Sequence, residues 1–146
     1  MPEDKKTDDK QTSEPTTEAH DRQAMEAARE TNRKRRLEYL AQIHKDLPAM
    51  VDQWKEKFRG AKIESAHVGG QLYIYRGLNR VEYLGIMSQG MDKAKNEEHL
   101  ASKGTLWPSI GILDWATLPA GLPVTLSDLI LAASSFGTEE VVPVRL

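Results

Sequence analysis

The sequence predicts an α+β protein, with a long N-terminal helical arm followed by a small domain that holds a β-hairpin and several short helices. Two observations lead to this class. The first 60 residues hold 13 acidic and 13 basic residues, whereas most of the large aromatic residues come later. In the later part, a Gly-Gly pair separates two β-rich runs. We divide the chain into a tail (1–17), a charged helical arm (18–49) and an α+β domain (50–146).

The tail and the arm differ in what they can bury. Residues 1–17 contain no large apolar side chain except Met1, so nothing there offsets the entropy of ordering, and we expect a tail that is disordered or ordered by a partner. From Glu18 the chain is rich in strong helix formers, with no glycine or proline before Pro48, which predicts a helix to Leu47. Its apolar stripe is narrow and consists of Leu37, Leu40, Ile43 and Leu47. We expect this stripe to bind a partner, because helices in proteins are stabilised mainly by packing an amphipathic face.

The next elements are a short helix and a hairpin. Proline disfavours helical dihedrals in the residue before it, so the first helix should break at Pro48 and a second should run to Phe58. The two β-rich runs, 62–68 and 71–76, flank Gly69-Gly70, and this arrangement predicts a hairpin with a tight turn.

The rest of the domain should be mainly helical. Asn79 with Glu82 three residues later resembles a capping box and predicts a helix start. A polar helix is expected over 92–102, and an irregular segment pinned by aromatic residues over 104–123. Thr125 should begin the last helix, which should end at Gly137, and residues 140–146 should form an edge strand.

Catalytic and metal-binding patterns are missing from the sequence. There is no cysteine, and the four histidines lack the spacing of metal ligands. The candidate acids and bases His67, Glu82, His99 and Asp114 show no converging spacing. We therefore predict a protein that is not an enzyme and that has no cofactor and no metal site. No signal peptide or membrane span is recognisable, so we expect a soluble, non-secreted protein.

Two further groups of residues are candidates for binding. Trp107 and Trp115 could form a platform for a partner, although filling the core is at least as good an interpretation of tryptophan in so small a domain. The basic run Arg33, Lys34, Arg35 and Arg36 could contact nucleic-acid phosphates. A solvated helix face is the favoured reading of this run, because the acidic and basic residues of the arm balance.

Over about residues 50–137 the chain resembles small tail or baseplate assembly and virion structural proteins of contractile-tailed bacteriophages. The resemblance lies in the order of the following short motifs: Trp54-x-x-x-Phe58, Tyr73-Ile74-Tyr75-Arg76, Leu78-x-Arg80-x-Glu82-Tyr83, Glu97-Glu98, Trp107-Pro108 and Leu118-Pro119-Ala120-Gly121. It implies a non-enzymatic protein of the virion or of the host cytoplasm that docks on other virion or assembly proteins in a multi-subunit complex. The alternative is a regulatory module that binds nucleic acid through Arg33 to Arg36.

Overall fold

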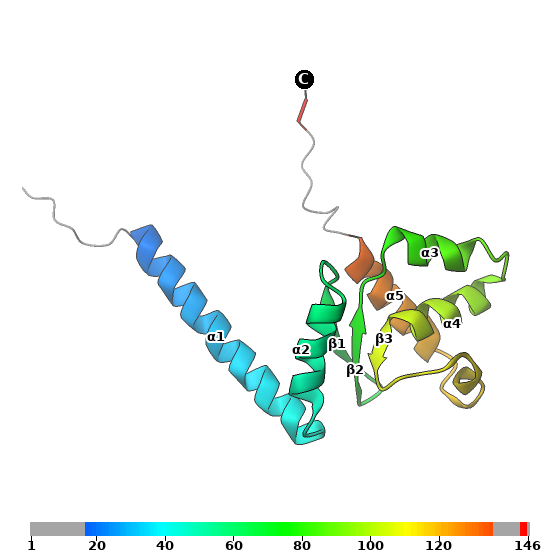
Figure 1. The fold of residues 1–146 in the computed structure, drawn as a ribbon, viewed down its shortest axis with the longest axis horizontal. Coiled ribbons are helices and arrows are strands. Elements are labelled where there is room, and N and C mark those ends of the chain that lie inside the picture. Colours follow the sequence, from blue (N-terminus) through cyan, green and yellow to red (C-terminus); the bar gives the residue numbers. More distant parts are fainter. Residues whose placement is uncertain (1–16, 136–143, 146) are drawn as a thin grey trace, which may run out of the picture. The chain divides into compact units, whose positions relative to one another are not determined.

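A computed structural model describes residues 17–135 and 144–145 (Figure 1). The elements in chain order are α1 (Thr17–Ile43), α2 (Leu47–Lys57), β1 (Ile63–Val68), β2 (Gln71–Arg76), α3 (Arg80–Met87), α4 (Lys93–Gly104), β3 (Thr105–Trp107), the 3-10 helix η1 (Ile112–Thr117) and α5 (Leu122–Ser134). The predicted α+β class is confirmed. Of the predicted tail, only Thr17 lies within the described residues, and it is the first residue of α1.

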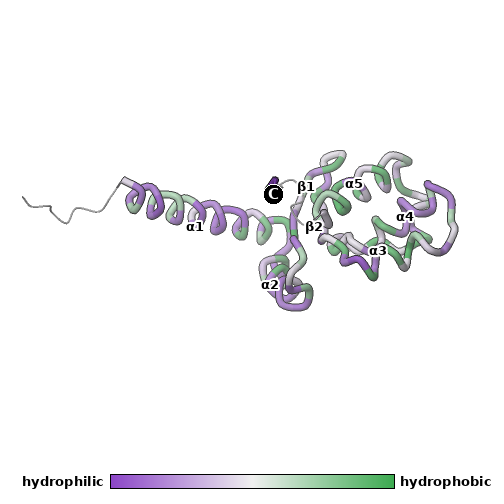
Figure 2. Tube along the Cα trace, turned by 90° about the horizontal axis from the view of Figure 1, so that it is seen from above, coloured by the Kyte–Doolittle hydropathy of each residue, from purple (hydrophilic) through white to green (hydrophobic). Residues whose placement is uncertain are grey.

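Contacts divide the chain into two compact units, with the boundary between Asp52 and Gln53 inside α2. In the first unit, α1 is largely hydrophilic along its length (Figure 2), and Leu40 is its one buried residue. None of the helices among the described residues is both long and apolar enough to cross a membrane.

The break between α1 and α2 was predicted, but α1 ends four residues earlier than expected, at Ile43 rather than Leu47. A turn follows in which the backbone N–H of Asp46 donates to Nδ1 of His44 at 3.2 Å. Helix α2 then starts at Leu47, which places Pro48 in its first turn. Proline is tolerated there because the N–H groups of the first turn have no partner within the helix.

The second unit is built on a three-stranded antiparallel sheet in the order β1-β2-β3. The predicted hairpin is confirmed, with Val68 opposite Gln71 at the turn. Gly69 and Gly70 have φ angles of 60° and 82°. Two successive positive φ angles are the requirement of the tight hairpin turn that matches the twist of the strands, and glycine adopts them without steric cost.

The core of this unit lies between the sheet and the C-terminal helices. Tyr73 and Tyr75, two residues apart on β2, each belong to one of two buried clusters. Helices α4 and α5 pack against each other and contribute to both clusters, and α5 also contacts the hairpin (Figure 1). The alternation of strand side chains explains why both tyrosines face the helices.

Three predictions for the C-terminal third need correction or fall outside the described residues. The segment 104–123 is not irregular throughout, since it contains β3 and η1, joined through a cis Trp107–Pro108 bond. Thr125 does not begin the last helix, because α5 starts at Leu122 with Pro123 in its first turn. Gly137 and most of the predicted edge strand, residues 140–146, lie outside the described residues. The two described residues of that segment, 144 and 145, are not in a strand.

Candidate docking surfaces

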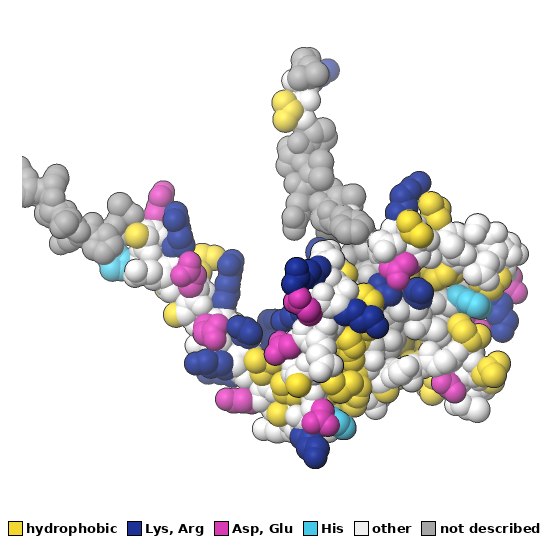
Figure 3. Space-filling model, viewed as in Figure 1, with side chains coloured by type: hydrophobic (Ala, Val, Ile, Leu, Met, Phe, Trp, Pro, Cys, Tyr) yellow, Lys and Arg dark blue, Asp and Glu magenta, His cyan; other side chains and the backbone are white. Residues whose placement is uncertain are grey.

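Helix α1 presents one side with exposed large side chains. Met25, Tyr39 and Ile43 are each at least one-third exposed. Consecutive residues of an α-helix are about 100° apart around its axis, so these three side chains fall within about 40° of one another. We call this the arm face, defined by Met25, Tyr39 and Ile43. Acidic and basic side chains are interspersed along the visible side of α1 (Figure 3).

The arm face differs from the stripe that the sequence predicted. Leu40 and Leu47 are buried, and Leu37 is half-buried, so of that stripe only Ile43 is exposed. The stripe was predicted from the spacing of apolar residues. Spacing identifies residues on one side of a helix, but it does not show which of them are already buried within the chain. The exposed side is turned by roughly 60° from Leu40, at the 100° per residue of a helix.

The basic run of α1 is exposed over all four residues, Arg33, Lys34, Arg35 and Arg36. Arg33 lies 3.9 Å from a carboxylate oxygen of Glu30, an exposed pair of the kind that adds little stability. Four consecutive residues wrap around the whole helix. They do not form one flat cationic face.

The two tryptophans of the predicted platform differ in burial. Trp115 is buried in the first core cluster, and its indole N–H donates to the hydroxyl of Ser102 at 2.8 Å. It therefore fills the core, as in the alternative interpretation. Trp107 is half-buried at the end of β3, opposite Ile74 of β2.

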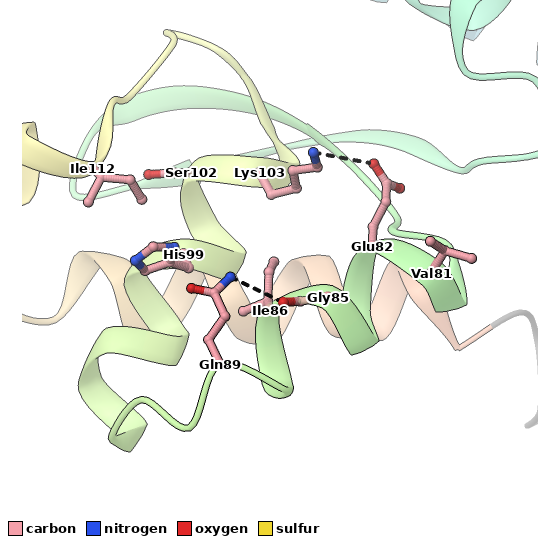
Figure 4. Close-up of a pocket in the computed structure, with 9 residues that line it drawn as sticks. All are labelled: Val81, Glu82, Gly85, Ile86, Gln89, His99, Ser102, Lys103 and Ile112. Atoms are coloured by element: carbon pink, nitrogen blue, oxygen red, sulfur yellow. Dashed lines mark hydrogen bonds and ion pairs between the residues drawn. The ribbon is translucent and has the colours of Figure 1, made fainter.

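A groove of about 560 Å³ lies among α3, α4 and η1 (Figure 4). It is lined by Val81, Glu82, Gly85, Ile86, Gln89, His99, Ser102, Lys103 and Ile112. Val81 and Gly85 are one turn apart on α3, and Gln89 follows the end of that helix, where its side-chain amide donates to the carbonyl oxygen of Gly85 at 3.1 Å. Gly85 has no side chain, and apart from its own helical neighbours no atom lies within 4 Å of the place where a Cβ would stand, so the groove is open at this position.

The rim of the groove is apolar and exposed. Two apolar residues that line the groove are exposed, Val81 at 81% and Ile112 at 38%. Leu84 on α3 is also exposed. The buried residue of α3 is Ile86. Exposed apolar side chains gathered around a concavity are typical of interaction sites.

One end of the groove is formed by a tightly held carboxylate. Arg76 donates to both oxygens of Glu82, from Nη1 to Oε1 at 2.9 Å and from Nη2 to Oε2 at 2.7 Å. Oε1 also accepts the backbone N–H of Asn79 at 3.1 Å, while the Asn79 side chain accepts the N–H of Glu82 at 2.8 Å. The predicted capping box is therefore present, and the same glutamate joins it to β2.

This environment fixes the charge of Glu82. The hydrogen bonds from Arg76 outweigh the effect of burial and lower the pKa of Glu82 from 4.5 to about 2, with smaller contributions from Asn79 and Lys103. Arg76 is itself buried, and its guanidinium carbon lies 4.1 Å from the centre of the Phe58 ring. Such stacking on an aromatic face is favourable for a cation.

Lys103 stands at the same end with a less direct contact. Its Nζ is 4.0 Å from Oε2 of Glu82, and its side chain is 51% exposed. The local cluster holds two positive charges, Arg76 and Lys103, against the one negative charge of Glu82; Arg76 is buried behind Glu82, and Lys103 is the cation that lines the groove. In Figure 4 the Lys103 side chain reaches toward the Glu82 carboxylate, and both residues line the groove.

Glu82 and His99 both line the groove, but they do not meet. They lie toward different ends of it, and the hydrogen-bond partners of the Glu82 carboxylate are Arg76 and Asn79 (Figure 4). A carboxylate with a pKa of about 2 holds no proton to donate near neutral pH. Asp114 is engaged elsewhere, accepting the N–H of Gly111 at 2.7 Å. Across residues 17–135 and 144–145, no three His, Asp or Glu side chains are grouped so that they could hold a metal ion.

The groove and the exposed arm face are the candidate docking surfaces of the chain. No match was found. Neither a protein-family model, nor a curated protein, nor a solved structure is similar enough to the chain to suggest a family.

Proposed function

We propose that the protein is a non-enzymatic component of a multi-subunit assembly that docks on other proteins through α1 and through its C-terminal domain. The assembly class we propose is the tail or baseplate of a contractile-tailed bacteriophage, with the chain acting as a structural part or as an assembly chaperone. The resemblance over residues 50–137 motivates this class.

The observation that carries the docking proposal is the exposure of α1. The helix is 27 residues long and buries only Leu40, while Met25, Tyr39 and Ile43 are exposed on one side. A helix on its own is marginally stable in water, and helices in proteins gain most of their stability by packing an apolar side against other elements. A second protein that covers the arm face would provide this packing.

The absence of catalysis is part of the proposal. It is supported by the separation of Glu82 from His99 and by the ionised state of Glu82. These are the two candidate acid–base residues that share a concave surface.

The test is incorporation of the chain into large complexes in its native host. We would tag the full chain, separate lysates on a density gradient and compare the natural chain with the double variant Met25→Asp and Ile43→Asp. Each aspartate would place a charge in an apolar contact without a counterion. We expect the share of the chain in heavy fractions to fall at least tenfold.

The matched control neutralises the basic run with glutamine at positions 33 to 36. We expect this control to stay in the heavy fractions, at low and high salt and after nuclease treatment. The nucleic-acid alternative predicts the reverse, because phosphate contacts weaken steeply with salt. Release by nuclease, or by the glutamine control but not by the aspartate variant, would replace our proposal with that alternative.

A further inference from the structure

We propose that the groove among α3, α4 and η1 is a docking site for an amphipathic helix of a partner protein, with an acidic residue at one end of its apolar face. The inference rests on the proposed docking function, but it concerns a surface of the C-terminal domain and does not involve α1. It names the chemistry of the partner segment.

The apolar part of this chemistry follows from the rim. Val81 and Ile112 both line the groove, and both are exposed. The hollow above Gly85 has room for an inserted side chain, because apart from its own helical neighbours no atom lies within 4 Å of the missing Cβ position. A groove of this kind accepts apolar side chains spaced by one helical turn.

The helical form of the partner follows from what the groove lacks. Val81 to Ile86 and His99 to Lys103 belong to α-helices, whose backbone groups are bonded within the helix. An extended peptide docks by pairing with a free strand edge, and helices do not offer one. The partner's backbone must therefore satisfy its own hydrogen bonds, as a helix does.

The acidic residue follows from charge. Arg76 occupies both oxygens of Glu82, and Lys103 adds a second positive charge that is half-exposed at the same end. A partner carboxylate placed there would neutralise the surplus and exclude basic partners by repulsion. The opposite end carries Gln89 and His99. The contrast between the two ends gives the bound helix a direction.

The experiment uses the full chain and two synthetic helical peptides made of leucine, alanine and glutamine, measured by fluorescence anisotropy. One carries two glutamates at one end of its leucine face, and the other carries two lysines at the same positions. We expect the acidic peptide to bind at least tenfold more tightly than the basic one. Equal affinities, or no binding of the acidic peptide, would overturn the inference.

Two variants locate the binding in the groove. Gly85→Leu fills the hollow without a charge, and leucine has a higher helix propensity than glycine, so the chain should fold at least as well. We expect this variant to bind the acidic peptide at least tenfold more weakly than the natural chain does. Lys103→Glu should reverse the preference between the two peptides. If neither variant changed the affinity for the acidic peptide, the peptide would bind elsewhere and the proposal would be wrong.

The controls separate this site from other surfaces. Val124→Asp changes an exposed valine of α5 outside the groove lining, and Lys93→Glu changes an exposed lysine at the start of α4. Neither should alter the affinity. The arm variant Met25→Asp with Ile43→Asp should also bind the acidic peptide normally, so a failure of the arm proposal and a failure of the groove proposal give different results.

Discussion

At the scale of single residues, Glu82 has three roles at once. It completes the capping box of α3, it neutralises the buried Arg76, and it forms one end of the groove. The sequence predicted the first role from the spacing to Asn79. It could not predict the second, because the pairing with Arg76 depends on how the end of β2 meets the start of α3.

Glu82→Gln tests the charge of this residue. The single amide oxygen of glutamine can still accept the Asn79 N–H, so the capping box can be kept, while the negative charge and one of the two acceptors of Arg76 are lost. We expect the free energy of unfolding at pH 7 to fall by about 3 kcal/mol, because a buried arginine loses its counterion. Urea denaturation of both chains measures the difference.

The same pair of chains gives a pH dependence. The pKa of Glu82 is lowered from 4.5 to about 2 in the folded state, so its stabilisation is complete above pH 4.5 and is lost as the pH falls toward 2. The difference between the natural chain and Glu82→Gln should therefore shrink over this window. Asp128→Asn, on the exposed side of α5, is the control and should show little difference at any pH. A difference that stays constant from pH 7 to pH 3 would refute the assignment.

At the scale of elements, the features that depend on local sequence signals were predicted well, and the features that depend on long-range packing were not. The hairpin and the start of α3 follow from local chemistry, namely two glycines with positive φ and an Asn side chain that caps a helix. Strand β3 has only three residues and exists because it pairs with β2. The contact is between segments far apart in sequence, so no local pattern marks it.

The joint between β2, α3 and α5 is a second case of long-range packing. A Cβ on Gly77 would stand 2.6 Å from the carbonyl oxygen of Ala133 and 2.9 Å from its carbon. Next to it, the backbone N–H of Leu78 donates to the hydroxyl of Ser134 at 2.7 Å. Glycine is needed here for close approach of two backbones, since the clashing atoms belong to the main chain and cannot rotate away.

Gly77→Ala should therefore lower the free energy of unfolding by about 1–3 kcal/mol, as overpacking does elsewhere. Gly85→Ala is the matched comparison, because it lies inside α3 with open space around the missing Cβ. It should raise stability by about 0.5–1 kcal/mol through helix propensity. Denaturation curves of the three chains measure both effects, and a loss of stability in both variants would contradict the packing argument.

At the scale of the whole molecule, burial is distributed unevenly. Both core clusters lie in the second unit, while α1 buries one residue of 27. The charge count of the sequence predicted this contrast. The groove was not predicted, because it depends on how α3, α4 and η1 meet, and these elements are apart in the sequence. The signal that could have found it is Gly85, one turn after Val81, which leaves one side of α3 without a side chain at that position.

Limited digestion with trypsin tests the uneven burial. Segments with few buried contacts open at low free-energy cost and are cut first. We expect the first cuts at the basic residues of α1, with a fragment that begins near Leu37 accumulating while residues 62–134 stay intact. Intact-mass spectrometry over time follows the fragments, and early cuts within 62–134 would contradict the expectation. Unfolding in urea should abolish the order of cutting.

The contribution of α5 to both core clusters also has a consequence for synthesis of the chain. Tyr73 and Tyr75 are made early, but Leu126 and Ile130, which share their clusters, come about 50 residues later. At the usual rate of about 5–20 residues per second, the ribosome needs several seconds to cover this interval. During that time the apolar side of the hairpin has no final partner. The nascent chain therefore exposes the apolar side of its hairpin until α5 has been made.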